Sequence, residues 1–358
     1  MKILAFYLPQ FHEIPENNEW WGKGFTDWTN VKKATQLVKG QYQPRKPLND
    51  NYYDLLDLAV MKWQSKIAQE HGIYGFCYYH YWFNGKLLLE KPLENMLKDK
   101  EVTIPFCFSW ANEPWARTWD GQNTNVLMAQ DYGTEEDWKL HFQYLLPFFQ
   151  DERYIKLDNK PMFLIYRTEN IPNVNEMISY WNELAIENSF NGIYLIETLN
   201  SFQKKSYVDN SEALVEFEPM YTISGNGMSL SYRIYDKLLK IFINKGLASK
   251  SYDHVWKTIL NRSNRSVKKK VYLGAFFDWD NTARKVYRGL FFRNMTLEKF
   301  RYYFKHQINK AKQQNSEFIF FNAWNEWAEG TYLEPDKKYK FKILETIKDV
   351  VGFYKKND

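Results

Sequence analysis

The sequence has few cysteines and no long apolar run. Its two cysteines, Cys77 and Cys107, show no Cys-x-x-Cys or metal-type spacing, which argues against a zinc site and favours buried thiols in a reducing compartment. No segment approaches the ~18 apolar residues that span a bilayer. The N-terminus MKILAFYLPQF has too short an apolar run for a signal peptide. We therefore expect a cytoplasmic protein without a transmembrane segment.

Motifs for binding nucleotides and nucleic acids are missing as well. No Walker A loop is present and no Gly-x-Gly-x-x-Gly follows the first apolar run, which argues against a Rossmann unit. The net charge of +5 is too small to indicate a nucleic-acid partner. Basic residues are concentrated in NRSNRSVKKK, 261–270, which we interpret as a solvated loop or, alternatively, as a contact with an anionic polymer or membrane surface. We expect neither a metal nor another cofactor.

Aromatic residues, in contrast, are abundant. They make up 18% of the chain, with 14 Trp and 26 Tyr. Trp and Tyr offer flat apolar faces with a polar edge, which suit the C–H faces and hydroxyl rims of sugar rings. Most of the Phe and about half of the Trp are accounted for equally well as core residues.

Eight short apolar runs recur along the chain, and most are continuous, as in strands that are covered on both faces. They are 2–8, 73–79, 104–110, 161–167, 193–198, 213–218, 271–277 and 318–324. Helical spacing of apolar residues appears between several of them, at 54–71, 134–149, 175–188, 229–245, 296–314 and 337–356, and more weakly at 86–99. This alternation predicts a closed (β/α)₈ TIM barrel formed by one domain, 1–358, with an open doubly wound sheet as the alternative. The insertions 12–53 and 219–260 are expected over the carboxyl ends of the strands.

Polar residues follow the apolar runs at one end, where a barrel places its active site. They are His12, Glu13, His80, Asn112, Glu113, Arg167, Glu169, Glu197, Glu216, Glu218, Asp278, Asp280, Asn325, Glu326 and Glu329. Paired carboxylates among indoles, without a metal cluster or a Ser/His/Asp pattern, suit the cleavage of glycosidic bonds. Each glutamate taken singly is explained as well by an ion pair or a solvated strand end.

The stretch FNAWNEWAEGTYLEPD, 321–336, places Glu326 and Glu329 three positions apart beside two tryptophans. In an extended strand these two side chains point to opposite faces, whereas in a helical turn they lie roughly 5–6 Å apart. We therefore predict that the last strand ends near Glu326 and that the chain turns helically through Ala328. Asn112 and Asn325 precede Glu113 and Glu326, where each amide could bind a sugar hydroxyl.

Two further patterns are open to more than one interpretation. Asp278-Trp279-Asp280 has the Asp-x-Asp form by which some nucleotide-sugar transferases hold a divalent metal, but contacts with substrate hydroxyls or a solvated pair explain it as well. His12 and His80 either bind sugar hydroxyls or only complete the barrel mouth.

Several long motifs resemble the WbsX-like family of bacterial surface-polysaccharide gene clusters, which is related to glycoside hydrolase family 99, the endo-α-mannosidases. They are FYLPQFH (6–12), WWGKGFTDWTNV (20–31), GFCYYHYWF (75–83), PFCFSWANEPWARTWDG (105–121), KPMFLIYR (160–167) and WNEWAEGTYLEP (324–335). The resemblance spans most of the chain and implies a (β/α)₈ carbohydrate-active enzyme of O-antigen or capsule metabolism, with an oligosaccharide or polysaccharide as its partner. The motif after the third strand departs from the usual family pattern at Pro114, Ala116 and Thr118.

The resemblance also implies roles for single residues. Glu326 matches the carboxylate that deprotonates the substrate's own 2-hydroxyl to give a 1,2-anhydro sugar, and Glu329 matches the one that protonates the leaving group and then activates water. The expected sugar contacts are His12, Trp28, His80, Trp110, Asn112, Glu113, Trp115, Arg117, Asp120, Arg167, Glu218, Asp278, Asp280, Trp324, Asn325 and Trp327.

Three alternatives stay open. The chain could be a glycosyltransferase that uses a nucleotide sugar, or a barrel that binds saccharides without turnover. Within the hydrolase class, Glu113 could be the acid/base and Glu326 a nucleophile that forms a covalent glycosyl-enzyme.

Overall fold

Eight parallel strands close into a barrel in the computed structural model, which describes residues 1–116, 126–225, 229–263 and 268–355. The strands are β1 (Lys2–Tyr7), β2 (Ile73–Phe83), β4 (Phe106–Trp110), β8 (Lys160–Ile165), β9 (Tyr194–Leu199), β10 (Ala213–Glu216), β12 (Lys270–Phe276) and β14 (Phe318–Asn322). Each pairs with its neighbours in the order β1-β14-β12-β10-β9-β8-β4-β2, and the pairing of β1 with β2 closes the ring. The predicted (β/α)₈ barrel is confirmed, and the open sheet is wrong.

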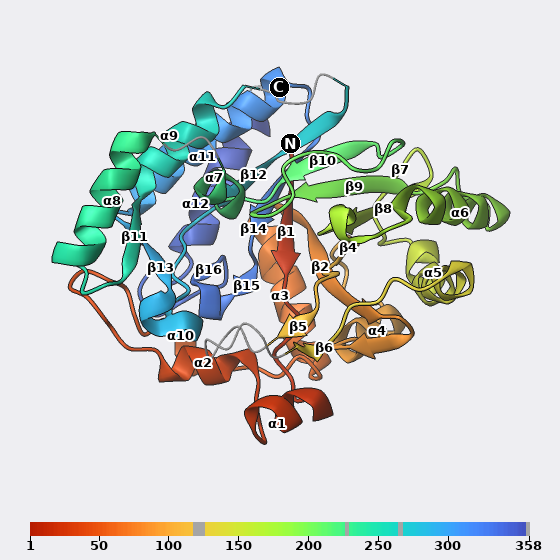
Figure 1. The fold of residues 1–358 in the computed structure, drawn as a ribbon, viewed down its shortest axis with the longest axis horizontal. Coiled ribbons are helices and arrows are strands. Elements are labelled where there is room, and N and C mark those ends of the chain that lie inside the picture. Colours follow the sequence, from red (N-terminus) through yellow and green to blue (C-terminus); the bar gives the residue numbers. More distant parts are fainter. Residues whose placement is uncertain (117–125, 226–228, 264–267, 356–358) are drawn as a thin grey trace.

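Helices surround the strands (Figure 1). They are α3 (Leu58–Glu70), α4 (Lys91–Lys98), α5 (Glu135–Gln150), α6 (Val174–Glu187), α9 (Tyr252–Asn261), α11 (Leu297–Gln313) and α12 (Lys342–Lys355). Local sequence fixes their ends; at α5, for example, Thr134 and Asp137 form a capping box that satisfies two backbone N–H groups. No helix in the described part of the chain is long and apolar enough to cross a bilayer.

The insertions carry the remaining elements. The first holds α1 (Pro15–Trp21), α2 (Asp27–Lys33) and the 3₁₀ turn η1 (Leu48–Asp50), and the second holds α7 (Met220–Ser224), α8 (Leu230–Phe242) and β11 (Ala248–Ser251). Shorter elements lie in other loops: β3 (Lys86–Leu88), β5 (Trp115–Ala116), β6 (Val126–Met128), β7 (Lys156–Leu157), η2 (Thr168–Asn170), α10 (Thr282–Lys285), η3 (Val286–Arg288), β13 (Leu290–Arg293), β15 (Asn325–Glu326), η4 (Trp327–Glu329) and β16 (Thr331–Tyr332).

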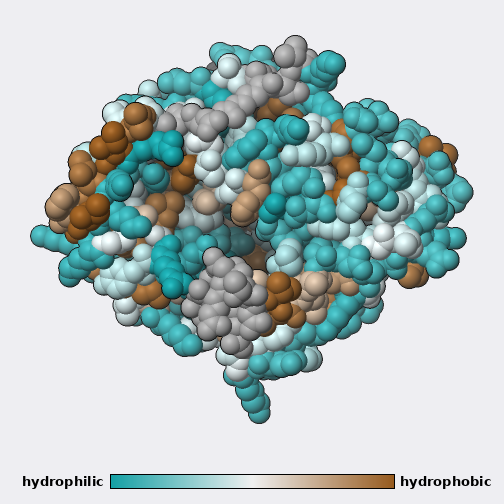
Figure 2. Space-filling view, in the orientation of Figure 1, coloured by the Kyte–Doolittle hydropathy of each residue, from teal (hydrophilic) through white to brown (hydrophobic). Residues whose placement is uncertain are grey.

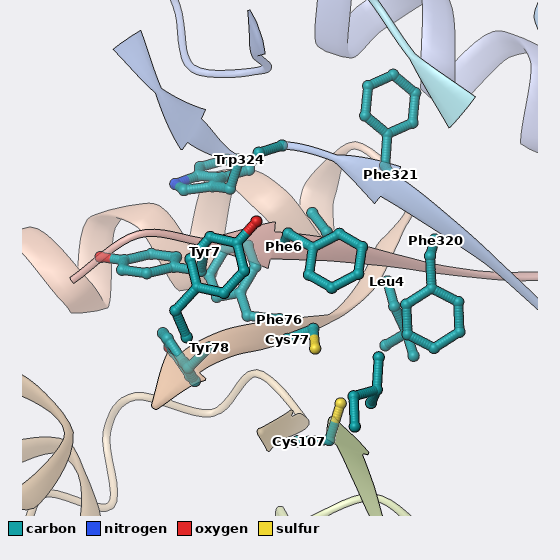
Figure 3. Packing of buried hydrophobic residues seen from close by; sticks show 14 of the residues in the cluster. Leu4, Phe6, Tyr7, Phe76, Cys77, Tyr78, Cys107, Phe320, Phe321 and Trp324 are labelled. Atoms are coloured by element: carbon teal, nitrogen blue, oxygen red, sulfur yellow. The ribbon is translucent and has the colours of Figure 1, made fainter. Parts of the chain in front are cut away.

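Aromatic side chains fill much of the barrel interior (Figure 3). The ring of Phe6 lies 5.8 Å from Tyr79, 5.1 Å from Phe217 and 5.8 Å from Phe320, centroid to centroid. Such rings bury a large apolar area each, so the lumen is a packed core. The predicted burial of the thiols is confirmed, since Cys77 and Cys107 are both buried and face each other across β2 and β4.

Candidate active site

The stretch after the last barrel strand folds back on itself. Strand β14 ends at Asn322, β15 pairs antiparallel with β16, and η4 lies between them as one 3₁₀ turn. Gly330 closes the turn at φ 62°, where a Cβ would lie 2.8 Å from the backbone nitrogen and oxygen of Asp280, so glycine is required. The predicted helical turn is confirmed, but the barrel strand ends four residues before Glu326 because the chain leaves the sheet to form this hairpin.

Both glutamates of the turn bind one guanidinium group. Arg284, on α10, donates from Nη1 to Glu329 Oε1 at 2.8 Å and from Nη2 to Glu326 Oε2 at 3.2 Å. Its Nη2 also lies 3.0 Å from Asp27 Oδ1. Since a guanidinium is a planar fork a few ångströms wide, the two glutamates converge on one place. They form the acid pair of the site.

The two members of the acid pair differ in how deeply they are buried. The side chain of Glu326 is 8% exposed and that of Glu329 is 24% exposed. Burial raises the pKa of Glu326 to about 8, and the negative charges of Glu329 and Asp27 add to the rise while Arg284 opposes it. At neutral pH, Glu326 therefore holds a proton in most molecules. A carboxyl with so high a pKa becomes a strong base once it ionises.

Three tyrosines surround the acid pair. Burial raises the pKa of Tyr79, Tyr81 and Tyr166, and the charges of both glutamates raise it further. We call the acid pair and these three tyrosines the cup. Tyr81 also meets the ring of Trp115 edge-to-face at 5.4 Å between centroids, so the predicted contact Trp115 borders the cup. Figure 2 shows a hollow near the middle of this face of the molecule.

The sequence pointed to none of these tyrosines, nor to Arg284 or Asp27. For the tyrosines a signal did exist. Tyr79 and Tyr81 alternate with His80 along β2, and in a strand alternate residues face the same side. Arg284 and Asp27 lie in loops far apart in sequence, where no local pattern marks them.

Glu113 acts on Tyr166, one of the tyrosines beside the acid pair: after burial, its charge raises the pKa of Tyr166, as the charges of Glu329 and Glu326 also do. Its Oε1 accepts a hydrogen bond from Arg167 Nη1 at 2.8 Å, and Arg167 also binds Glu169. Burial raises the pKa of Glu113, against the opposing charge of Arg167. With 38% of its side chain exposed, Glu113 remains open to a ligand, whereas Arg167 is mostly enclosed by its acidic partners.

The two asparagines predicted to bind the sugar form hydrogen bonds with the protein's own backbone instead. Asn112 is fully buried; its amide binds the backbone of Arg167 in both directions, at 2.8 Å each. Asn325 is also fully buried and binds the backbone N–H and C=O of Leu8 at 2.7 and 2.9 Å. The expectation that these amides bind sugar hydroxyls is wrong, because their hydrogen-bonding atoms hold loops together.

The predicted tryptophan contacts other than Trp115 lie in the packed interior. Trp324 packs on Phe76 at 4.9 Å, and Trp28 packs on Trp327 at 5.5 Å between centroids. Trp110 lies between the barrel and the helices, with its ring 4.7 Å from His141 on α5. All four are at most 4% exposed, so they support the site without presenting a face to a sugar.

Glu334 binds the turn that carries the acid pair. Its carboxylate accepts hydrogen bonds from Trp327 Nε1 at 2.6 Å, Tyr53 Oη at 2.8 Å and Gln64 Nε2 at 2.7 Å. Burial raises its pKa to about 7, although all three donors favour the ionised form. A cavity of about 500 Å³ is lined by Glu334, Trp327 and Trp63, and neither member of the acid pair lines it.

The two predicted histidine contacts are both buried. His80 points out of the barrel and bonds His141, with 2.8 Å between the Nε2 atoms; burial lowers its pKa to about 3. His12 is 1% exposed, and burial lowers its pKa, opposed by the charges of Asp54 and Glu90. A sugar-binding role is wrong for His80, because its ring is buried between β2 and α5, on the side of the strand that faces away from the barrel interior.

The remaining acidic contacts are in ion pairs or buried hydrogen bonds. Asp278 binds Arg45 Nη2 at 2.7 Å, and Asp280 accepts from Gln41 Nε2 at 3.0 Å. Glu218 binds Arg262 at 2.7 Å. Within the described residues no group of three or more His, Cys, Asp or Glu could hold a metal ion, and the Asp-x-Asp pattern serves to fasten the first insertion to the barrel.

Parts of the prediction fall on residues outside the described ones. Arg117 and Asp120 lie in the segment 117–125, and 264–267 lies within the basic stretch 261–270. The described basic residues of that stretch mostly have acidic partners in the protein: Arg262 binds Glu216 and Glu218, and Lys270 binds Glu317 at 3.2 Å. The contact of the whole stretch with an anionic polymer or a membrane surface stays a prediction.

Solved structures define the class of fold. The chain is similar to the GH99 endo-alpha-mannosidase from Bacteroides thetaiotaomicron in complex with bis-tris-propane, with a TM-score of 0.60 and 13% identity over 99% of this chain and 97% of that one. A glycoside hydrolase-like protein matches with a TM-score of 0.62 and 12% identity, over 98% and 93% of the two chains. At such identities the likeness is one of fold alone, that of a (β/α)₈ barrel.

Family membership is more specific. Residues 3–347 match the model of the family described as Glycosyltransferase WbsX, and the chain belongs to that family. The uncharacterized protein WxcX of Xanthomonas campestris pv. campestris, in two strains, is 32% identical over 356 residues. This match covers 98% of the chain but 49% of WxcX, so the chain spans about half the length of these relatives.

Proposed function

We propose that the chain is a retaining glycoside hydrolase or transglycosylase that acts on α-linked surface polysaccharide or its oligosaccharide precursors. The observation that carries this proposal is the convergence of Glu326 and Glu329 on Arg284 inside a tyrosine-lined cup. Two carboxylates that converge on one guanidinium and differ in burial suit a division into base and acid. Family membership and fold agree with a carbohydrate-active enzyme.

In the proposed mechanism, Glu326 acts on the substrate's 2-hydroxyl. Its ionised carboxylate takes the hydroxyl proton, and the 2-oxygen attacks the anomeric carbon as the glycosidic bond breaks. With a pKa of about 8, the ionised fraction of Glu326 is small at neutral pH but accepts a hydroxyl proton more readily than an ordinary carboxylate does. Arg284 holds both carboxylates in place and keeps part of Glu326 ionised.

Glu329 completes the cycle. Its carboxylic acid protonates the leaving oxygen, which yields a 1,2-anhydro sugar and a free alcohol. Its carboxylate then takes a proton from water, which attacks the anomeric carbon, and Glu326 returns its proton to the 2-oxygen. Two inversions give net retention, and a sugar hydroxyl in place of water gives transfer. The greater exposure of Glu329 agrees with contact to a leaving group and to water.

The test is a screen of defined α-linked oligosaccharides, with the anomeric configuration of the product measured by NMR. We expect retention, and loss of at least 10³-fold in kcat for both E326Q and E329Q. E136Q, on the exposed face of α5, is the matched control and keeps full activity. Undiminished cleavage by E329Q contradicts the proposed roles, and oligosaccharide binding without any turnover indicates a saccharide-binding barrel.

One observation favours a second candidate, a glycosyltransferase: the description of the matched family. It predicts that the chain binds a nucleotide sugar. Because Asp278 and Asp280 are engaged with Arg45 and Gln41, we expect no metal-dependent donor binding in calorimetry with several nucleotide sugars. Micromolar binding that needs a divalent metal favours the transferase instead.

Within the hydrolase class, trapping of a covalent sugar on Glu326 identifies the alternative scheme in which Glu113 is the acid/base.

A further inference from the structure

Helix α8 packs on the protein with its polar side inward. Among its side chains only Asp236 is buried. That carboxylate binds Lys250 Nζ and Arg293 Nη2, each at 2.9 Å. Lys250 lies on β11 and Arg293 on β13, two strands that pair with each other. The helix is thus fixed by a buried ionic contact, with its opposite side outward.

The outward side is strongly apolar. Leu230, Ile234, Leu238 and Ile241 follow one another at spacings of four, four and three residues, which places them on one stripe. They are 71%, 53%, 48% and 57% exposed, and the adjoining Phe242 is 77% exposed. Figure 2 shows the hydrophobic surface over α8 at the upper left of the molecule. An exposed patch of this kind marks an interaction site.

Positive charges border the stripe. Arg233, Lys237, Lys240 and Lys245 are exposed and form no ion pair with any described residue. The one acidic residue of the helix, Asp236, is already bound to two cations. The outer surface of α8 therefore combines apolar side chains with four uncompensated positive charges. Two copies of this surface facing each other would repel.

We propose that α8 binds the surface of an anionic lipid bilayer and lies in its plane. An interfacial helix has this design: a large apolar face that enters the boundary between headgroups and acyl chains, and Lys and Arg that reach the anionic headgroups. Its 13 residues extend ~20 Å, too short to span the membrane.

This placement connects the membrane contact with the loop that carries Arg284. The apolar stripe faces away from β11 and β13, and β13 follows directly on α10 and η3, in the same loop as Arg284. The unit that binds the lipid is therefore joined to the loop that carries Arg284. Resting on the proposed function, this connection makes saccharide held at an anionic membrane surface the substrate of the cup.

The experiment is flotation of the full chain with vesicles of phosphatidylglycerol and phosphatidylethanolamine, compared with vesicles of phosphatidylcholine. We expect at least tenfold tighter binding to the anionic vesicles, weakened by added salt. L238Q/F242Q and K237E/K240E each reduce this binding at least tenfold. The control L140Q/I186Q changes two side chains that are 53% and 62% exposed on other helices and leaves binding unchanged.

Because all of the changed side chains are exposed, circular dichroism and the Tm should stay as in the wild type. Equal binding by wild type and L238Q/F242Q overturns the proposal, as does failure to bind anionic vesicles. A dimer in light scattering that L238Q/F242Q dissociates, without vesicle binding, assigns the stripe to an interface between copies. Binding of both vesicle types alike refutes the role of the charges.

Discussion

The raised pKa of Glu326 makes a prediction that needs no substrate. A carboxyl that holds its proton up to a pH of about 8 in the folded state, against 4.5 in its ordinary state, makes folding pH-dependent. Below pH 4.5 the folded and unfolded states are both protonated there, and Glu326 has no effect. Between pH 4.5 and 8 the unfolded chain has released the proton while the folded chain keeps it. The free energy of unfolding therefore falls as the pH rises, and levels off above pH 8.

The size of the effect follows from the same two values. Each pH unit in that interval costs about 1.4 kcal/mol, so the full interval costs roughly 5 kcal/mol. E326Q resembles the protonated carboxyl in shape but cannot ionise. We expect E326Q and wild type to be about equally stable near pH 5, and E326Q to be more stable by a few kcal/mol at pH 8.

The assay is urea unfolding of both proteins from pH 5 to pH 8.5, followed by tryptophan fluorescence. Other titrating groups are common to the two proteins and cancel in the difference. E136Q controls for the loss of one formal charge at an exposed site. A stability difference that does not change with pH refutes the reasoning, because it means that Glu326 is ionised in the folded protein throughout.

Three other changes test the site. If Glu326 is the base, kcat/KM of the wild type rises tenfold per pH unit up to about pH 8, whereas a fall of kcat/KM through this pH assigns Glu326 as the acid. R284Q removes the neighbouring cation, so it should move the rise of kcat/KM to higher pH and lower activity at pH 7 at least tenfold. N325A leaves buried backbone groups unpaired and should cost about 2–4 kcal/mol in urea unfolding, with wild-type stability as the contrary result. D278A leaves Arg45 buried without its anion and should cost about 3–5 kcal/mol, while chelators leave activity unchanged; sensitivity to chelators contradicts the assignment of this aspartate to an ion pair.

The barrel could be predicted because its strands are apolar on both faces. Runs such as 104–110 and 318–324 need no knowledge of their neighbours to be recognised. The turn at Trp327 could also be predicted, because only a helical spacing lets Glu326 and Glu329 act together. In both cases a local period decides the structure.

The contacts of the site could be predicted less well, because they depend on which side of a strand faces inward. The polar residue at the end of an apolar run, His80, is predicted to face the site, whereas its neighbours Tyr79 and Tyr81 lie beside the acid pair. A shift of one residue moves every side chain to the other face. Arg284 meets Asp27 across 257 residues of sequence, a distance over which no periodicity extends.

Hydrogen bonds between such distant segments have a consequence for folding during synthesis. Leu8 is bonded to Asn325 across 317 residues, and Gln41 to Asp280 across 239. A nascent chain on the ribosome cannot settle its first fifty residues until nearly all of it has been synthesised, and bringing such distant segments together is entropically costly. Truncation before the final hairpin removes both glutamates of the acid pair and Asn325, the partner of Leu8, so this barrel should acquire its cup only in the last step of folding.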